Sequence, residues 1–158
     1  MCSLKRKFAV WYKKLTLKNT NENAIIKVVA RHFQNGDSDN VELITDGSFY
    51  KKGDKFYVLY KENEEMGMAD CSVTIVIDGD TVTMRRRGGY ELKLTYREGE
   101  SESVVYYMPF GEMNMTQSTK KVSHSLDETG GNIKIVYDLS IGGEVQTNKL
   151  DIEIKRKG

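Results

Sequence analysis

Apolar and polar residues alternate with a period of two along much of this chain, and that pattern limits its fold more than any other feature. The segments "LKLTYR" (92–97), "IKIVYDLSI" (133–141) and "LDIEIK" (150–155) show it clearly. Successive side chains of a β-strand point to opposite faces of the sheet. Such alternation is therefore typical of strands with one side packed and the other in water.

From Ala24 onward, short segments of this kind follow one another, and we expect ten strands. They are Ala24–Phe33, Val41–Tyr50, Lys55–Glu62, Ser72–Asp78, Thr81–Arg87, Glu91–Arg97, Ser103–Met108, Glu112–Val122, Asn132–Ile141 and Glu144–Lys155. Turn sequences that contain glycine separate several of them. The strongest is "DGD" at 78–80, because Asp-Gly suits a two-residue hairpin turn.

About ten consecutive strands do not remain a flat open sheet, because closure or folding over is needed to remove exposed edges. We therefore predict an all-β fold, an antiparallel β-barrel of about eight to ten strands, with a two-sheet sandwich as the alternative. The 158 residues are enough for one domain with a sizeable core. We expect the barrel domain to span residues 24–158, after a basic extension at 1–23.

The extension carries six lysines and arginines between positions 5 and 18, and no acidic residue there. If it is helical, Leu4, Phe8, Trp11 and Leu15 fall on one face. One interpretation is a basic amphipathic helix that contacts an anionic membrane or RNA. The other is a solvated tail, or a helix docked on its own domain. A pattern this short arises easily by chance, which favours the second interpretation.

The charge balance limits the possible partners. There are 24 lysines and arginines against 23 aspartates and glutamates, a formal net charge of +1, whereas nucleic-acid binders usually carry a marked basic excess. We therefore do not expect a nucleic-acid partner, although Arg85, Arg87, Lys93 and Arg97 could form an outward basic stripe. No apolar run approaches the roughly 20 residues of a transmembrane helix. Two cysteines do not suggest a disulfide framework, so we expect a cytoplasmic location.

Residues that carry catalysis are scarce. The two histidines, His32 and His124, are interpreted as surface strand or loop residues. The sequence has no C-x-x-C, no H-E-x-x-H, no glycine-rich phosphate loop before a helix and no nucleophile elbow. We therefore expect no metal site, no cofactor and no enzymatic activity.

Several motifs in the middle and last third of the chain occur in an order that is known from one protein family. They are "YKENEEMG" (60–67), "RRG" (86–88), "YYMPFGEMNMTQSTKKV" (106–122), "SLDETGGNIKIVYDLSIGGE" (125–144) and "NKLDIEI" (148–154). With them, the region from about Ile25 to Ile154 resembles the YwiB-like family of uncharacterised bacterial β-barrel proteins, whose fold is similar to that of lipocalins. The resemblance implies a lipocalin-like barrel and, by analogy alone, a ligand cup. It implies no activity, because the function of the family is unknown.

The strand period divides the run of three arginines at 85–87. Arg86 falls on the apolar face of its strand, whereas Arg85 and Arg87 fall on the face with the threonines. If the apolar face is the barrel interior, Arg86 points inward and its two neighbours point to water. An inward guanidinium needs an anionic or carbonyl partner, because an unpaired buried charge costs several kcal/mol.

Glu62 is the candidate partner of Arg86. Either face of "KFYVLYKE" (55–62) could point inward, but Tyr60 and Glu62 match the family pattern, which favours the face that contains them. We predict a bidentate Glu62–Arg86 pair near one mouth of the barrel. The pair would act either as an internal brace or as a site that orients a ligand or an anion.

A second inward set is aromatic and sulfur-rich. With Glu62 and Arg86, we expect the barrel to be lined by Tyr60, Tyr96, Met113, Met115, Thr119 and Tyr137. Such residues either form an amphipathic pocket or fill a small barrel solidly. The leading predicted function is non-catalytic binding of a small hydrophobic or amphipathic ligand. The alternatives are a structural or interaction protein with a filled barrel, and a module that contacts RNA or anionic membranes through its basic residues.

Overall fold

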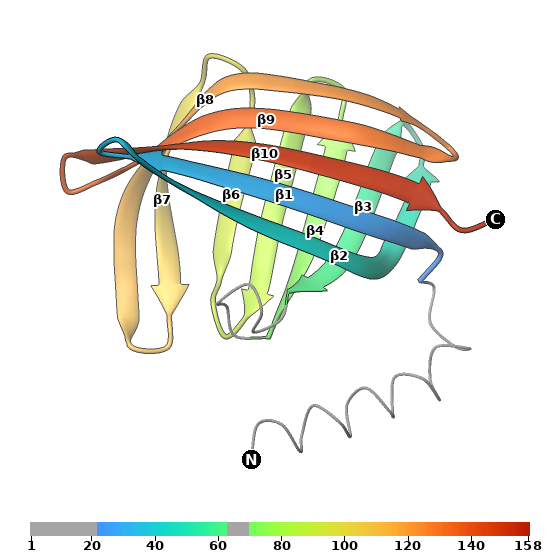
Figure 1. Cartoon of the computed structure of the whole chain (residues 1–158), viewed down its shortest axis with the longest axis horizontal. Helices are drawn as coiled ribbons and strands as arrows, with labels where there is room; N and C mark the ends of the chain where they lie inside the picture. Colours follow the sequence, from blue (N-terminus) through green and yellow to red (C-terminus); the bar gives the residue numbers. More distant parts are fainter. Residues whose placement is uncertain (1–21, 63–69) are drawn as a thin grey trace.

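Ten antiparallel strands make up the part of the protein that the computed structural model describes, residues 22–62 and 70–158 (Figure 1). They are β1 (Ala24–Gln34), β2 (Asp37–Lys52), β3 (Lys55–Glu62), β4 (Cys71–Asp78), β5 (Thr81–Gly88), β6 (Leu92–Tyr96), β7 (Ser101–Met108), β8 (Gly111–Asp127), β9 (Gly130–Ile141) and β10 (Glu144–Arg156). All ten expected strands are present. β2 and β8 extend well beyond the expected bounds, whereas the others differ from them by a residue or two at most.

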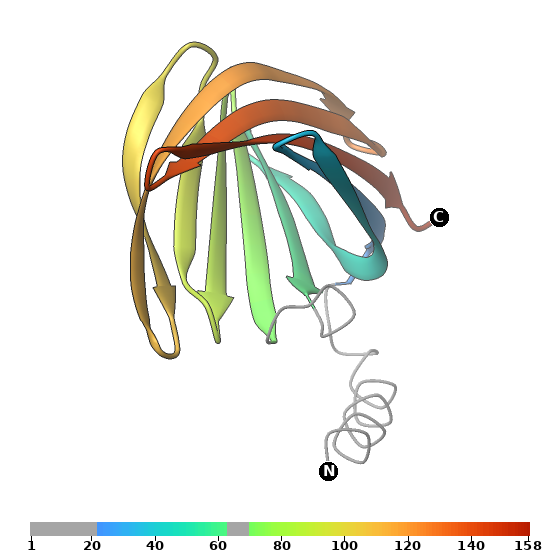
Figure 2. The ribbon, with the colours of Figure 1, turned by 60° about the vertical axis from the view of Figure 1, so that its left-hand side comes forward.

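The strands form one sheet in the order β6-β5-β4-β3-β2-β1-β10-β9-β8-β7, which curls into a nearly closed barrel (Figure 2). Neighbouring strands are consecutive in sequence except β1 and β10, which pair along nearly their whole length. The barrel closes between β6 and β7 through one bridge, Glu91–Tyr107, with two backbone hydrogen bonds of 2.9 Å. The predicted barrel is therefore confirmed, and its seam lies between two strands from the middle of the chain.

β2 bends at Gly47 and so belongs to two sides of the barrel. Its first part pairs with β1 as far as Gly47, and its last part pairs with β3 from Ser48 onward. A Cβ atom at position 47 would overlap the side chain of Ile26 and the carbonyl oxygen of Leu59. Glycine is therefore the residue that lets the neighbouring strands approach this closely at the bend.

A bulge at Lys120 changes which residues of β8 point inward. The pairing of β8 with β9 shifts between Thr119 and Lys121. Before the shift, odd-numbered residues such as Met115 are buried; after it, even-numbered residues such as Val122 are the less exposed ones. An extra residue in one strand bends it and re-aims the side chains that follow. The bulge thus keeps apolar side chains of both halves of β8 on the inner face.

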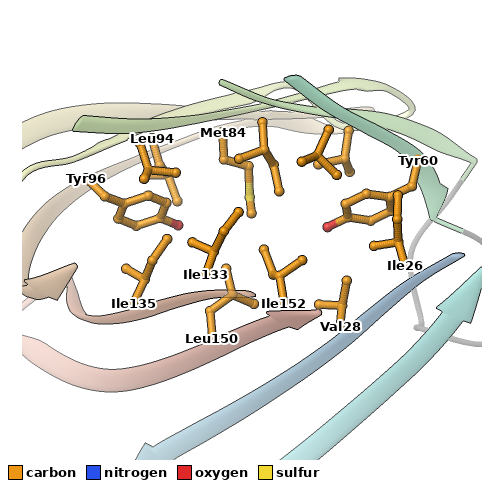
Figure 3. Packing of buried hydrophobic residues seen from close by; sticks show 14 of the residues in the cluster. Ile26, Val28, Tyr60, Met84, Leu94, Tyr96, Ile133, Ile135, Leu150 and Ile152 are labelled. Carbon is orange, nitrogen blue, oxygen red and sulfur yellow. The ribbon is translucent and has the colours of Figure 1, made fainter. Parts of the chain in front are cut away.

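Aliphatic and aromatic side chains point into the barrel interior and form one buried cluster (Figure 3). The largest residues with fully buried side chains are Tyr96, Phe49, Ile26, Ile75, Ile77, Ile133, Ile135, Ile152, Gln117, Val58, Val73 and Val82. They come from strands on all sides of the barrel. The alternation in the sequence thus corresponds to inward and outward faces, and burial of the inward face is the main stabilising contribution.

The expected basic extension at 1–23 lies almost wholly outside the described residues, and so does the segment 63–69 between β3 and β4. β1 begins at Ala24. Within residues 22–62 and 70–158, the structure contains no helix long and apolar enough to cross a membrane.

Candidate functional site

Glu62 and Arg86 form a bidentate ion pair inside the barrel, near the end where β3 stops. Arg86 Nε donates to Glu62 Oε1 at 2.5 Å, and Arg86 Nη2 donates to Glu62 Oε2 at 3.0 Å. The Glu62 side chain is 3% exposed and the Arg86 side chain 16%. Both residues flank β4, because Glu62 is paired with Cys71 and Arg86 with Val73. This pair, predicted from the strand period of β5 and from the family pattern in β3, is confirmed.

This ion pair affects the phenols around it. Burial alone lowers the pKa of Arg86, but the hydrogen bonds and charge of Glu62 outweigh burial and raise that pKa overall. Burial raises the pKa of Tyr60, with a further upward contribution from the Glu62 carboxylate. Burial also raises the pKa of Tyr106, and Arg86 beside its hydroxyl partly opposes that shift. The site therefore holds one charged pair surrounded by neutral phenols.

Tyr96 and Tyr137 meet in the barrel interior. Their ring centroids lie 4.8 Å apart at an interplanar angle of 56°, a tilted geometry that aromatic rings prefer. Burial raises the pKa of both phenols. In Figure 3 the rings of Tyr96 and Tyr60 enter the interior from two sides, with their hydroxyls directed toward the middle. Among the described residues, the Tyr96 hydroxyl has no hydrogen-bond partner of good geometry.

The remaining predicted site residues lie on β8. Met115 and Thr119 are buried, whereas Met113 is half-buried. Gln117, on the same face, is fully buried and donates from Nε2 to Thr119 Oγ1 at 2.7 Å. Its Oε1 has no partner within the described residues. These side chains belong to the packed interior, and a role in contacting a ligand stays a prediction.

The two histidines form long-range contacts that no sequence pattern indicated. His32 is half-buried rather than on the surface, and its Nδ1 lies 2.5 Å from Oδ1 of Asn148, a residue 2% exposed. His124 Nε2 lies 2.5 Å from the carbonyl oxygen of Gly79 in the β4–β5 turn. These contacts join positions 116 and 45 residues apart. Only the tertiary structure brings such positions together.

The described residues contain one free cysteine and no cluster of metal ligands. Within residues 22–62 and 70–158, no three His, Cys, Asp or Glu side chains are grouped to hold a metal ion. Cys71 is a buried free thiol whose Sγ donates to the carbonyl oxygen of Tyr90 at 3.7 Å. What the barrel presents is charge, hydrogen-bonding groups and apolar surface.

A groove of about 450 Å³ lies over the seam between β6 and β7. Its lining residues are Arg85, Arg86, Arg87, Glu91, Leu92, Lys93, Glu102, Ser103, Val104, Val105 and Tyr107. Of the residues predicted to form the site, only Arg86 belongs to this lining. Barrel closure creates the groove by bringing β6 and β7 together, so the pattern within each strand could not have located it.

Pairing across the seam is incomplete. Beyond the Glu91–Tyr107 bridge, Glu102 Oε2 accepts a hydrogen bond of 2.7 Å from the backbone N–H of Thr95, in the position where a backbone carbonyl would bind in a regular sheet. Leu92 and Val104 flank the seam on the inner side, with 8% and 6% of their surface exposed. The groove therefore combines an apolar inner wall with a charged outer rim.

The buried phenols predict a loss of stability at alkaline pH. The folded-state pKa values of Tyr60, Tyr96 and Tyr137 are raised above the ordinary value of 10.0. Their contribution to stability is therefore fully present below pH 10 and is lost as the pH rises above it. In an alkaline titration, the phenolate absorbance of these residues should appear together with unfolding followed by circular dichroism. Complete tyrosine ionisation with a native circular dichroism spectrum would contradict this.

Comparison with known proteins places the chain in a family. Residues 26–154 match a family model described as a domain of unknown function, DUF1934. The uncharacterized β-barrel protein YwiB of Bacillus subtilis (strain 168) is 34% identical over 109 residues, which cover 69% of this chain and 75% of that relative. The crystal structure of the ywiB protein from Bacillus subtilis aligns with a TM-score of 0.78 and 26% identity, over 90% of this chain and 99% of that one. The resemblance seen in the motifs is thus confirmed, and the chain belongs to the DUF1934 family, that of the YwiB-like β-barrel proteins of unknown function.

Proposed function

We propose that this protein binds a small, partly apolar ligand without catalysing a reaction, and that the ligand lies in the groove at the β6–β7 seam. The observation that carries the proposal is the groove itself, whose volume of about 450 Å³ falls in the range of small-molecule sites. Its walls combine the apolar side chains of Leu92, Val104 and Val105 with charged groups and the Tyr107 hydroxyl. Such a mixture suits a ligand with one apolar and one polar end.

Incomplete strand pairing supports the same location. In the described barrel, β6 and β7 share only the Glu91–Tyr107 bridge. Backbone groups on facing strand edges that do not pair with each other are available to water or to a ligand. A ligand at the seam can therefore form hydrogen bonds with backbone groups of a kind that, in the rest of the sheet, are used for strand pairing.

Arg86 links the groove to the interior. Glu62 uses the Nε and Nη2 atoms of Arg86, and the guanidinium has further N–H donors. Because the carboxylate holds the guanidinium in one orientation, these donors are fixed before a ligand arrives, which reduces the entropy that binding must remove. The Tyr106 hydroxyl also interacts with the guanidinium of Arg86 and helps to hold it. We propose that the predicted interior residues act behind the groove, as its support.

This proposal makes the barrel lipocalin-like in function, with the ligand received at the seam. The buried free thiol of Cys71 agrees with a reducing environment, and we propose a cytoplasmic location for that reason. The alternative is a structural or interaction protein with a filled barrel, which the many fully buried side chains of the interior favour.

Titration of the full chain with octanoate and with 1-octanol, followed by NMR of the backbone amides, tests the proposal. We expect saturable shifts at groove residues such as Lys93, Val104 and Val105 with at least one of the two probes. Val105→Trp places an indole in the groove and should reduce the affinity at least tenfold. Val145→Trp is the matched control, because Val145 lies on β10 outside the groove and is 52% exposed. Absence of saturable shifts with both probes, or equal binding by the two variants, would support the filled-barrel alternative instead.

A further inference from the structure

We infer that the ligand of the seam groove carries an anionic head group, which Arg85 and Lys93 bind at the outer rim. The inference rests on the proposed function and names the chemical class of its ligand. That class is a small amphipathic anion, with a carboxylate-like or phosphate-like head and an apolar remainder.

The positions of Arg85 and Lys93 are unfavourable for strand pairing unless an anion binds between them. They are directly opposite each other on β5 and β6, and both are exposed. Like charges in directly opposite positions on one face of a sheet destabilise the pairing. Arg87 adds a third cation two residues along β5 and also lines the groove. An anion between these side chains removes the repulsion and gains charge-assisted hydrogen bonds.

These three cations line the groove together without an ion pair to balance them. Within residues 22–62 and 70–158, no carboxylate lies within salt-bridge distance of Arg85, Arg87 or Lys93. Some exposed cations elsewhere are paired, as in Lys27–Glu42 and Lys55–Asp78. Others are not, but they do not line one groove together as Arg85, Arg87 and Lys93 do. The groove therefore concentrates uncompensated positive charge in a chain whose formal net charge is only +1.

The acidic residues of the groove restrict where the anion can lie. Glu102 is engaged with the backbone of Thr95 at 2.7 Å, and Glu91 lies at the bridge to β7. Glu102 lies on β7, so its carboxylate repels an anion from the β7 side. Glu91 precedes Lys93 by two residues and repels an anion from the beginning of β6, which leaves the place beside Arg85 and Lys93. The apolar part of the ligand then extends toward Leu92 and Val104. A chain of phosphates, as in RNA, would meet both carboxylates, so the arrangement favours a single head group.

The matched probes octanoate and 1-octanol, which share a chain length, test this inference in the full-length protein. We expect octanoate to bind at least tenfold more tightly than octanol, and increasing salt to reduce the difference. In the Arg85→Gln/Lys93→Gln variant the two affinities should become nearly equal. The control is Lys121→Gln/Lys134→Gln, which removes the same charge from exposed positions outside the groove and should keep the preference for octanoate.

The outcomes separate the inference from the proposed function. If octanol binds the unchanged protein as tightly as octanoate, the inference is wrong and the proposed function stands. If neither probe binds, both are wrong. Phosphatidylglycerol vesicles distinguish a free anion from a lipid headgroup in a bilayer. Vesicle binding that depends on Arg85 and Lys93, without binding of monomeric octanoate, would overturn the assignment to a free ligand.

Discussion

Replacing Glu62 with alanine should lower the free energy of unfolding by about 3–5 kcal/mol, because it leaves the largely buried guanidinium of Arg86 without its carboxylate. Two hydrogen bonds, of 2.5 and 3.0 Å, are lost at once. The Glu62 side chain is 3% exposed and that of Arg86 16%, so water only partly replaces the missing partner. Urea unfolding monitored by circular dichroism measures the change.

Two further variants separate the cost of an unpaired charge from a general loss of packing. Glu62→Leu/Arg86→Met removes both charges, and we expect it to recover most of the stability, because well-packed apolar residues often replace a buried ion pair at little cost. Glu42→Ala removes the carboxylate of the exposed Lys27–Glu42 pair and should change stability by less than about 1 kcal/mol. Similar losses for Glu62→Ala and Glu42→Ala would show that Glu62 and Arg86 do not act as a buried pair.

Replacing Tyr96 with alanine should cost about 3–5 kcal/mol, the range for truncating a large buried aromatic side chain. Tyr96 is completely buried, and its ring packs against that of Tyr137 at a centroid distance of 4.8 Å. Removing the ring creates a cavity in the middle of the barrel. The hydrogen-bonded strands around the cavity hold one another in place, so they cannot collapse into the space. Thermal and urea unfolding of the variant measure the loss.

Tyr96→Phe is the control for that experiment, and it should keep most of the stability that Tyr96→Ala loses. No hydrogen bond of good geometry reaches the Tyr96 hydroxyl among the described residues, although the Tyr137 hydroxyl interacts with it. Its removal therefore takes away a buried polar group and at most one weak hydrogen bond. We expect a change within about 1 kcal/mol. A loss of several kcal/mol for Tyr96→Phe would show that the hydroxyl is bonded in the native protein.

The sequence was sufficient to predict the bounds of the strands whose period of two is unbroken. β3 was predicted with both ends correct, and the turn at 52–54 defines where it begins. β2 was predicted too short because its first residues, 37–40, are all polar and exposed and show no alternation. β8 was predicted too short because the bulge at Lys120 reverses the inward face partway along the strand.

Of the candidate site, the Glu62–Arg86 pair was predictable from the sequence. The strand period placed Arg86 on the apolar face of its strand, and the family pattern favoured the face of β3 that contains Glu62. The energetic need of a buried guanidinium for a carboxylate connected the two residues. The groove was not predictable. Its walls come from β5, β6 and β7, and the side chains that shape it belong partly to the outward faces that the alternation assigns to solvent.

The sequence by itself determined that this protein is built from antiparallel strands, which side chains of most strands point inward, and that Arg86 differs from Arg85 and Arg87. These properties follow from the geometry of a single strand, in which successive side chains alternate. Only the tertiary structure decided that β1 pairs with β10 and that the barrel closes at β6 and β7. Strand order and register depend on contacts between residues far apart in sequence, and the period of two is the same whichever strands become neighbours. The seam, and with it the groove, is therefore a property of the closed barrel.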